Sequence, residues 1–368
     1  IQNANSSAPI LLTGCIPPDF EQKLLLENSN VSLANLDVLR KNPDLLNEWL
    51  KGNGFRENLK EKTPRIFTPG MAQESPHIGI LNISDGCLDA CSFCSTRLVK
   101  GKHRSVSPEK ILSEAKRYLE NGCKELWLTG QDTSCYGFDI GTNLAELAKK
   151  ILEQNSGDYK IRLGMGNPRH LEKYLDEMLS VYEDDRIYKF IHLPVQSGSD
   201  SVLQAMGRKH NVNTFRKMAE AFISKFSYFT LSTDIIVGFP GETREDFEQT
   251  CKLISDLKPS ICNITRFVAR PNTVAEKLPN KIPGKEQHYR SATLSELFQK
   301  IALENNLSRV GKTARVLTEK SGHRNGTYIA RDEAYRSIAL KGNYKPGTWL
   351  NVQIEKAETF ALLAKEVL

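Results

Sequence analysis

Residues 85–94 read DGCLDACSFC, and this stretch decides the fold through the placement of its three cysteines. Cys87, Cys91 and Cys94 follow a CxxxCxxC spacing, directly after an apolar, β-branched run at His77 to Ile83 that predicts a strand. Three thiolates on one tight loop can hold three irons of a 4Fe–4S cube and leave the fourth iron open to a ligand. A zinc site or three buried structural thiols are the alternatives, although structural zinc prefers four protein ligands.

The order of strand, polar loop and helix continues along the chain after the cysteines. Five more apolar runs predict strands, at Glu125 to Thr129, Lys160 to Met165, Tyr188 to Leu193, Phe229 to Val237 and Ile261 to Phe267. Helical spacing of apolar residues lies between them, in a segment that Ser107 opens and at Asn143 to Leu152, His170 to Val181, Thr214 to Phe226 and Arg244 to Leu257. This alternation indicates parallel βα units, in an open doubly wound sheet or a partial barrel, because six units are too few for a closed eightfold barrel.

Polar or glycine-containing motifs follow every predicted strand. After the cysteine loop of the first strand come TGQD at 129–132, GMGNP at 164–168, PVQSGS at 194–199, GFPGE at 238–242 and RPNT at 270–273. Each of these motifs, taken alone, is explained equally well as an ordinary turn between a strand and a helix. In a barrel of parallel strands, however, these ends meet at one face, which carries the active site. Five such ends together with the thiol loop favour a ligand-binding face.

The two ends of the chain depart from this alternation. Residues 1–62 hold one strand-like run and two short helical stretches, which is too little for a complete domain. Residues 307–368 switch to short β-type runs separated by Gly and Asn, which predicts a small barrel. This segment has eleven Lys or Arg against six Asp or Glu, so +5 of the net charge of +6 lies there. The charge favours a nucleic-acid partner over a merely solvated small domain.

Composition excludes a membrane-spanning protein. Of the 368 residues, 26% are charged, and no stretch approaches the roughly 18 consecutive apolar residues of a spanning helix. Eight cysteines are too few for a disulfide scaffold in a chain of this length, so reduced thiols in the cytoplasm are expected.

Taken in order, the motifs resemble those of the radical S-adenosylmethionine (SAM) superfamily and, within it, the methylthiotransferases, closest to the archaeal and eukaryotic branch that acts on tRNA. The resemblance rests on Gly14-Cys15, SDGCLDACSFCSTRLVKGKHRSVSPE, LTGQD, GMGNP, HLPVQSGSDSVLQAMGRKH, DIIVGFPGET and ARPNT. It implies an α/β fold with a partial (β/α)6 radical SAM barrel at residues 63–306 and a small C-terminal TRAM β-barrel that binds RNA at 307–368. Residues 1–62 would then be the remnant of a truncated N-terminal α/β domain.

The resemblance also implies the cofactors. Cys87, Cys91 and Cys94 would be the catalytic ligands of a 4Fe–4S cluster, whose open iron binds SAM and whose electron releases a 5'-deoxyadenosyl radical. The implied SAM-binding residues are Gly130, Gln131, Asn167, Gln196, Ser197 and Gly238.

The implied reaction is methylthiolation of C2 of N6-threonylcarbamoyladenosine at position 37 of tRNA. One SAM methylates sulfur on an auxiliary 4Fe–4S cluster, and a second SAM supplies the radical that removes hydrogen from C2. The family takes three N-terminal cysteines for the auxiliary cluster, but only Cys15 precedes the radical motif here. We therefore expect its partners upstream of Ile1 and an absent or incomplete second cluster in this chain.

The expected partners are tRNA and a flavodoxin- or ferredoxin-like electron donor, while the sulfur donor is left open and no membrane is expected. Predicted RNA contacts are Lys312, Arg315, Arg324 and Arg331, with Arg270 as a phosphate or carboxylate contact near the substrate. Within the family, N6-isopentenyladenosine in tRNA or an aspartate of a ribosomal protein are alternative substrates. An RNA-binding protein with a purely structural cluster is the alternative from another class.

Overall fold

The computed structural model describes residues 9–13, 24, 31–34, 39, 42–52, 76–322 and 324–367. Cys15 therefore lies outside the described residues. The N-terminal elements are β1 (Ile10–Thr13) and β2 (Val31–Ala34), which pair in parallel, and α3 (Pro43–Leu50). No helix in the described ranges has both the length and the apolar character needed to cross a membrane.

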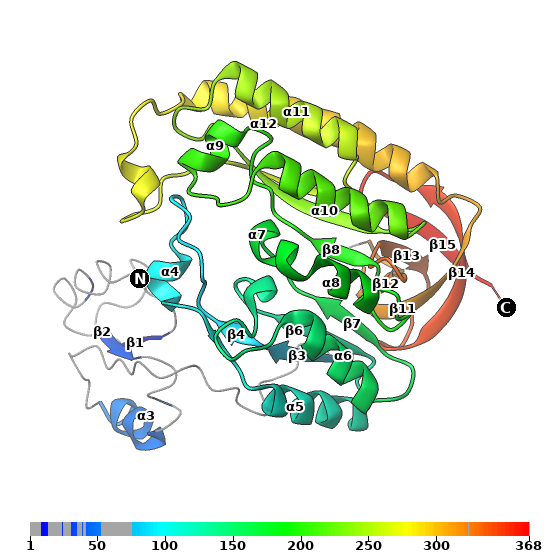
Figure 1. Ribbon diagram of the computed structural model, residues 1–368. Coiled ribbons are helices and arrows are strands. Elements are labelled where there is room, and N and C mark those ends of the chain that lie inside the picture. The colour runs from blue at the N-terminus through cyan, green and yellow to red at the C-terminus, as the bar shows by residue number, and fades with distance from the viewer. Residues whose placement is uncertain are drawn as a thin grey trace.

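Six parallel strands in chain order form the centre of the molecule (Figure 1). They are β3 (Ile78–Asn82), β6 (Glu125–Thr129), β7 (Lys160–Leu163), β8 (Phe190–His192), β9 (Thr230–Val237) and β10 (Ile261–Arg266). The first three and the last three form two sheets, which a parallel bridge between Ile161 and Ile187 connects. Within the described part of the chain β10 does not pair with β3. The predicted partial (β/α)6 barrel is confirmed, open on one side.

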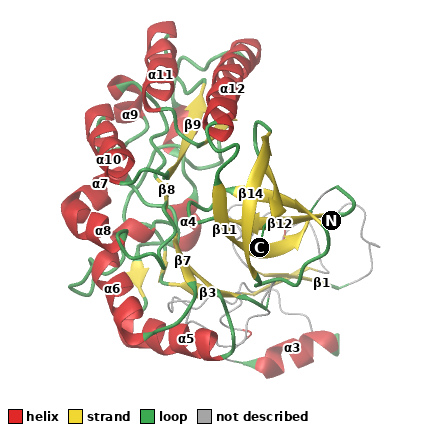
Figure 2. Cartoon of the chain, turned by 90° about the vertical axis from the view of Figure 1, so that its right-hand side faces the viewer, coloured by secondary structure: helices red, strands yellow, loops and turns green. Residues whose placement is uncertain are grey.

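Helices cover the outer side of these strands (Figure 2). They are α5 (Pro108–Glu120), α6 (Leu144–Gln154), α7 (Pro168–Leu171), α8 (Leu175–Val181), α10 (Val212–Lys225), α11 (Arg244–Leu257) and α12 (Gly284–Leu307). Strand residues alternate between the helices and the interior of the barrel, called the lumen below. Leu126 and Leu128 are fully buried under the helices, while Trp127 between them faces the lumen. A capping box of Thr243 and Asp246 fixes the start of α11.

Three short elements shape the loops at the C-terminal ends of the strands. The hairpin of β4 (Ser84–Asp85) and β5 (Arg104–Ser105) encloses the cysteine loop together with α4 (Thr96–Lys100). The third element is α9 (Asp200–Ala205), which follows β8. None of them is predicted by the periodicity of the sequence, because each is too short to show a period.

The C-terminal segment forms a closed five-stranded barrel in the order β11-β12-β13-β15-β14. Its strands are β11 (Thr313–Ser321), β12 (Thr327–Arg331), β13 (Ser337–Lys341), β14 (Trp349–Ala357) and β15 (Leu362–Glu366). Alternate apolar residues, among them Val316, Ile338 and Val352, are fully buried inside it. The predicted small barrel is confirmed, although its fifth strand, β15, is absent from the prediction.

Candidate active site

The three thiols lie on one loop at the C-terminal end of the barrel strands, a region we call the mouth (residues 83–94, 130–135, 164–170, 194–199 and 238–242). Cys87, Cys91 and Cys94 are partly exposed and form no disulfide. Burial raises the pKa of Cys87 to about 12 and also raises the pKa of Cys91. A metal that binds here must therefore displace protons from these thiols.

The end of α9 and the residues that follow it hold this thiol loop in place. Ser92 donates its backbone N–H to the carbonyl of Met206 at 2.8 Å and its hydroxyl to the carbonyl of Ala205 at 2.9 Å. On the other side, the backbone N–H of Ala275 donates to the carbonyl of Ser92 at 2.8 Å. The loop is therefore positioned by segments more than a hundred residues away in sequence.

Arg208, which the sequence reasoning did not single out, reaches the thiol loop from the same segment. Its Nη2 donates to the carbonyl of Pro194 at 2.8 Å, and its Nη1 lies 3.6 Å from Sγ of Cys91. Its Nε is buried without a hydrogen-bond partner among the described residues. A guanidinium at this distance favours the thiolate of Cys91 and so opposes the effect of burial. Because Arg208 lies beyond a helix and not at a strand end, the strand-end criterion could not find it.

Asp89, between the first two cysteines, ties the thiol loop to the end of β7. Its carboxylate accepts hydrogen bonds from Asn167 Nδ2 at 2.7 Å and from the guanidinium of Arg169, and Nε2 of His170 lies 3.5 Å away. Burial alone would raise the pKa of Asp89, but the hydrogen bonds and positive charge of His170 and Arg169 lower it to about 2. Asp89 is therefore ionised, and its charge is paired with Arg169 next to the thiols.

Of the predicted SAM-binding residues, three lie near this anchor. Gly130 packs against Ser84. Gln131 is partly buried, and its Oε1 has no partner among the described residues, so this acceptor is available to a ligand. Asn167 is almost fully buried, with its amide committed to Asp89 and its Oδ1 accepting the N–H of Arg169 at the start of α7.

The other three predicted SAM-binding residues lie at the ends of β8 and β9. Gln196 has a positive φ of 79° and exchanges backbone hydrogen bonds with β9. Ser197 is completely buried, with its hydroxyl 3.3 Å from that of Thr250 on α11. Gly238 has a φ of 72°, and a Cβ there would lie 2.4 Å from the side chain of Gln287, so glycine is required on both grounds. Any contribution of Ser197 therefore acts through its backbone or through the shape of the loop.

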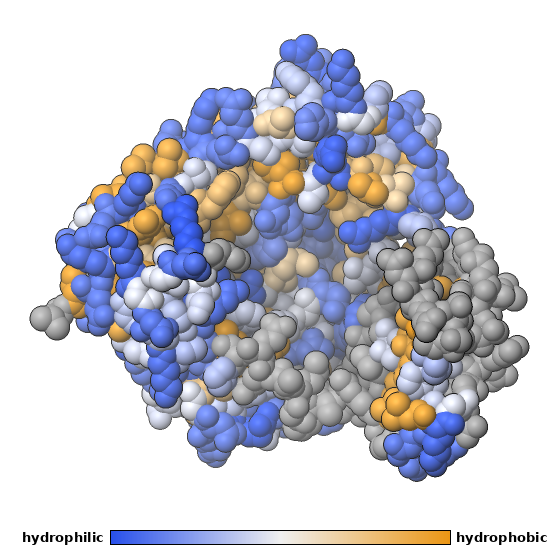
Figure 3. All heavy atoms as spheres, turned by 180° about the vertical axis from the view of Figure 1, so that it is seen from behind, coloured by the Kyte–Doolittle hydropathy of each residue, from blue (hydrophilic) through white to orange (hydrophobic). Residues whose placement is uncertain are grey.

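A polar cluster lies in the lumen below the mouth. Nε2 of His192 is 2.9 Å from Oδ1 of Asp234, and Nδ2 of Asn263 donates to the same oxygen at 2.7 Å. The side chains of His192 and Asp234 retain 19% and 29% of their exposure. Burial tends to raise the pKa of Asp234, but the bonds from His192 and Asn263 lower it. On the face opposite that of Figure 1 the surface is hollowed near its centre, with hydrophilic residues in the hollow (Figure 3).

The N-terminal ends of the same strands, which we call the floor, are filled by the C-terminal barrel. Tyr335, in the loop between β12 and β13, has a φ of 60° and packs its ring 4.9 Å from that of Tyr188 and 5.2 Å from that of Phe190. The guanidinium of Arg162 lies 5.2 Å from the Tyr335 ring. The backbone N–H of Lys189 donates to the carbonyl of Glu333 at 2.8 Å. This loop therefore closes the bottom of the lumen.

The floor also buries a carboxyl group. Glu125, at the start of β6, is 2% exposed and accepts a hydrogen bond from the indole N–H of Trp127. Burial, aided by the charge of Glu319, raises the pKa of Glu125 to about 7, although Trp127 and Arg331 act in the opposite direction. The two ends of the strands thus differ: the mouth holds partly exposed thiols, and the floor holds packed aromatic rings and a buried carboxyl group.

Comparison with known proteins agrees with this geometry. The Radical SAM superfamily model matches residues 81–254, and the TRAM domain model matches residues 307–367. The chain is 40% identical over 349 residues to a probable threonylcarbamoyladenosine tRNA methylthiotransferase of Archaeoglobus fulgidus. The aligned region covers 94% of this chain and 80% of that protein. A Pyrococcus horikoshii protein of the same name is 36% identical, covering 97% of this chain and 83% of its own. The human threonylcarbamoyladenosine tRNA methylthiotransferase is 32% identical, over 91% of this chain and 58% of its own.

The chain belongs to the threonylcarbamoyladenosine tRNA methylthiotransferase family. Membership in this radical SAM family implies a 4Fe–4S cluster and SAM. The residues at the mouth fit that pair of cofactors. Three thiols on an anchored loop, with the guanidinium of Arg208 beside one of them, suit the cluster, and the free amide oxygen of Gln131 suits SAM. In the described ranges, no three His, Cys, Asp or Glu side chains are grouped so as to hold one metal ion. A cube does not need such a group, because each thiolate binds a different iron.

Three of the predicted RNA contacts of this methylthiotransferase lie on the outer surface of the C-terminal barrel. Lys312 is exposed. Arg315 pairs with Asp158 through both nitrogens, at 3.0 Å and 2.5 Å, and stacks over Trp349. Arg324 is largely exposed and pairs with Glu358 at 3.3 Å.

The remaining two predicted contacts are Arg331 and Arg270. Arg331 is turned toward the floor, where it pairs with Glu319 at 2.9 Å and stacks on Tyr335. Arg270 is exposed, and its Nη1 is 3.5 Å from the hydroxyl of Ser95, immediately after the last cysteine. The structure therefore does not bring the five together: Arg270 lies at the mouth, Arg331 at the floor, and the others on the outer surface of the small barrel.

Proposed function

We propose that this chain methylthiolates C2 of N6-threonylcarbamoyladenosine at position 37 of tRNA by radical SAM chemistry. The observation that carries the proposal is the thiol loop held over the mouth of a six-stranded partial barrel, in a chain of this family. The polar cluster of His192, Asp234 and Asn263 lies below that loop. A loop that positions a reactive cofactor above a polar lumen is suited to a substrate that enters the barrel.

We further propose that Cys87, Cys91 and Cys94 hold a 4Fe–4S cluster, which supplies the electron that cleaves SAM. The chain's own part is to bind, orient and exclude water. Ser92 and Asp89 fix the loop, and the guanidinium of Arg208 places positive charge beside Cys91. Gln131 offers a free carbonyl oxygen, an acceptor suited to the amino group of SAM.

In this proposal SAM is also bound at the ends of the neighbouring strands. Gly238 allows its backbone to approach a ligand closely, and the backbone at Gly130 and Gln196 has a shape fixed by its hydrogen bonds and packing. Asn167 acts through Asp89, because its amide is committed to that carboxylate. Ser197 shapes the loop from its buried position.

The auxiliary cluster is part of the same proposal. Cys15 would be one of its ligands in the complete set of N-terminal cysteines, with sulfur from a donor not yet identified and electrons from a flavodoxin- or ferredoxin-like protein. A tRNA substrate and reduced thiols together support a cytoplasmic site of action. The domain division that we propose is 1–62, 63–306 and 307–368.

The test has two measurements on anaerobically reconstituted protein that carries the complete N-terminal cysteine set. The first is formation of 5'-deoxyadenosine from SAM with a reductant, which we expect, and its absence would refute the radical chemistry. The second is mass spectrometry of nucleosides from tRNA incubated with the protein. We expect 2-methylthio-N6-threonylcarbamoyladenosine.

The second measurement also separates the alternatives. A 2-methylthio-N6-isopentenyladenosine product, or a methylthiolated ribosomal aspartate, would replace the proposed substrate while retaining the reaction. Binding of tRNA with no SAM cleavage would instead indicate an RNA-binding protein with a structural cluster.

A further inference from the structure

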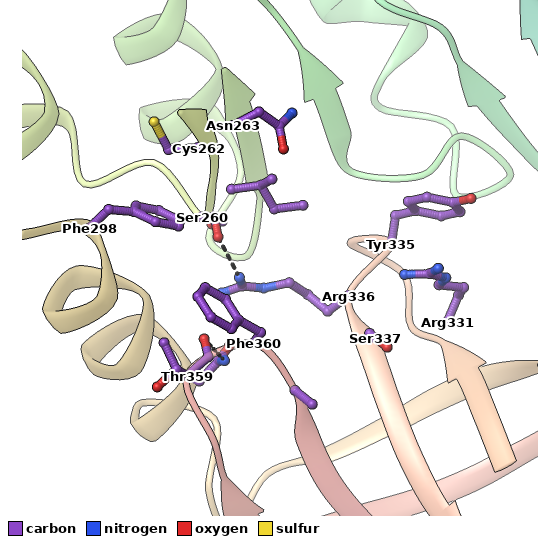
Figure 4. Close-up of a pocket in the computed structure, with 13 residues that line it drawn as sticks. Ser260, Cys262, Asn263, Phe298, Arg331, Tyr335, Arg336, Ser337, Thr359 and Phe360 are labelled. Atoms are coloured by element: carbon purple, nitrogen blue, oxygen red, sulfur yellow. Dashed lines mark hydrogen bonds between the residues drawn. The ribbon is translucent and has the colours of Figure 1, made fainter. Parts of the chain in front are cut away.

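A pocket of about 290 Å³ lies where β10 and α12 meet the C-terminal barrel (Figure 4), and no residue of the thiol loop lines it. Its walls are Ser260, Ile261, Cys262, Asn263, Phe298, Asn306, Arg331, Tyr335, Arg336, Ser337, Thr359, Phe360 and Ala361. Two of these residues are arginines and none is acidic. The volume is at the small end of ligand pockets, which span roughly 300 to 1,000 Å³. A pocket of this size suits a small ligand or a single group of a larger one.

Arg336 supplies the positive charge in this pocket. It is only 9% exposed, and its Nη1 donates to the carbonyl of Ser260 at 3.4 Å. Its Nε is buried without a hydrogen-bond partner, and the guanidinium forms no ion pair within the described part of the chain. The nearby carboxylate of Asp332 is already engaged by the hydroxyl of Tyr228 and by two backbone N–H groups. A buried guanidinium with an unused N–H is a site for an anion.

Phe360 supplies an aromatic face on the same pocket. The residue is 67% exposed, and its ring is nearly parallel to that of the buried Phe298, with centroids 6.4 Å apart. Figure 4 shows Arg336 reaching toward Ser260 with the Phe360 ring beside its guanidinium. The phosphate of a nucleotide whose base stacks on Phe360 would thus lie near the guanidinium of Arg336.

The turn that carries Phe360 is held in one conformation. Nδ2 of Asn306, at the end of α12, donates to the carbonyls of Glu358 at 2.7 Å and Thr359 at 3.1 Å. The backbone N–H of Glu358 also donates to the carbonyl of Ala361 at 2.8 Å. An exposed ring on a fixed turn loses little entropy on binding, so it is preorganised for stacking.

We propose that this junction pocket binds one unpaired nucleotide of the tRNA, with the base on Phe360 and the phosphate at Arg336. The open-sided aromatic face favours an RNA loop over a free small anion, because stacking of unpaired bases on exposed rings is the common mode of single-strand recognition. Arg324 lies beside the same turn, where Glu358 pairs with it at 3.3 Å and offsets its charge. The proposal rests on the proposed function, since it takes tRNA as the substrate.

The primary test is tRNA binding by the Phe360→Ala variant, measured by fluorescence anisotropy with a labelled tRNA transcript. The matched control is Tyr289→Ala, which removes an exposed aromatic ring from the opposite end of α12. We expect Phe360→Ala to weaken binding about tenfold, the usual size of a lost base–aromatic stack, and Tyr289→Ala to change it less than about twofold. Equal binding by wild type and Phe360→Ala would overturn the proposal.

A second test addresses the phosphate. We expect Arg336→Gln to reduce the slope of log affinity against log salt by about one, and Arg336→Lys, which keeps the charge, to retain most of the slope. Unfolding curves of both variants verify that the C-terminal barrel remains folded. An unchanged slope in a folded Arg336→Gln protein would show that no tRNA phosphate contacts Arg336. The same conclusion would follow if AMP saturated the pocket without affecting tRNA binding.

These results are distinguishable from a failure of the proposed function. Wild-type protein that makes no methylthio product, but binds tRNA in a Phe360-dependent manner, would refute the reaction and retain the pocket. Wild-type protein that modifies tRNA, with Phe360→Ala binding equally well, would refute only the pocket.

Discussion

The mouth and the floor of the barrel are built on the same six strands but in opposite ways. At the mouth, polar atoms such as Oε1 of Gln131 and Nε of Arg208 lack partners among the described residues, and the thiols remain partly exposed. At the floor, the loop between β12 and β13 inserts Tyr335 against Tyr188 and Phe190, so that the aromatic rings pack together. Partly exposed thiols on an anchored loop can bind a cofactor, whereas the packed rings of the floor stabilise the contact between the strands and the small barrel. The mouth is therefore the functional end and the floor the structural end.

The largest expected effect removes one thiol at the mouth. Cys91→Ala should abolish cluster binding and 5'-deoxyadenosine formation while leaving the unfolding transition almost unchanged, because the side chain is small and partly exposed. Iron content, electron paramagnetic resonance and SAM cleavage measure the loss. Cys251→Ala, a half-buried thiol on α11, is the matched control and should keep full iron content. A Cys91→Ala protein with normal iron would contradict the assignment of the loop.

An intermediate effect is expected at the floor. The pKa of Glu125 is raised from 4.5 to about 7, so between these pH values the folded protein holds a proton that the unfolded chain has released. Stability from this group is therefore present below about pH 4.5 and lost as the pH rises toward 7. Glu125→Gln cannot ionise and keeps an acceptor for Trp127, so its free energy of unfolding should exceed that of wild type at pH 8 by up to about 3 kcal/mol.

Denaturant unfolding at pH 5 and pH 8 measures this difference. Glu153→Gln, on the exposed side of α6, is the control and should follow wild type at both pH values. If the curves for Glu125→Gln and wild type ran parallel across this range, the carboxyl group would not be protonated in the folded state.

The smallest effect is expected at the rim of the floor, where Arg315 on β11 pairs with Asp158 ahead of β7. The pair is half exposed, so its loss should cost less than about 1 kcal/mol of stability. Lys312→Gln and Arg315→Gln should each lower the salt slope of tRNA binding by about one. Asp158→Asn frees Arg315 and should strengthen binding by at most a few-fold.

Anisotropy titrations at several salt concentrations test this, with Lys300→Gln on α12 as the control. Weaker tRNA binding by Asp158→Asn would show that the pair itself, and not the free guanidinium, supports the RNA surface.

Much of the architecture could be predicted from local pattern. The strand at Glu125–Thr129 and the helix at Arg244–Leu257 agree with the prediction at both ends, because uninterrupted apolar periodicity and caps define them. The helix predicted from His170 to Val181 is instead broken into α7 and α8 with a 3-10 turn between them. The fifth strand of the small barrel, β15, is absent from the prediction although it is as long as β12 and β13, and its place is set by pairing with β13 and β14.

Some residues of the candidate site could likewise be predicted from local sequence, and others could not. The three cysteines and the glycine motifs are visible in the sequence, because their spacing along the chain is itself the signal. Arg208 beside Cys91, and Asn167 bonded to Asp89, are contacts across 117 and 78 residues, which no local pattern contains. The junction pocket likewise joins β10, α12 and the β14–β15 turn, three elements that meet only in the folded chain.

The sequence by itself determined the family, the order of strands and helices, the thiol loop and the concentration of positive charge in the last 62 residues. These features depend on residue type and short-range spacing, which are written along the chain. Only the tertiary structure decided which arginines are free and which are paired, that the small barrel closes the floor, and that a pocket with an unpaired guanidinium lies at the junction. Those outcomes depend on packing between distant segments, where burial and hydrogen-bond partners are set by the fold.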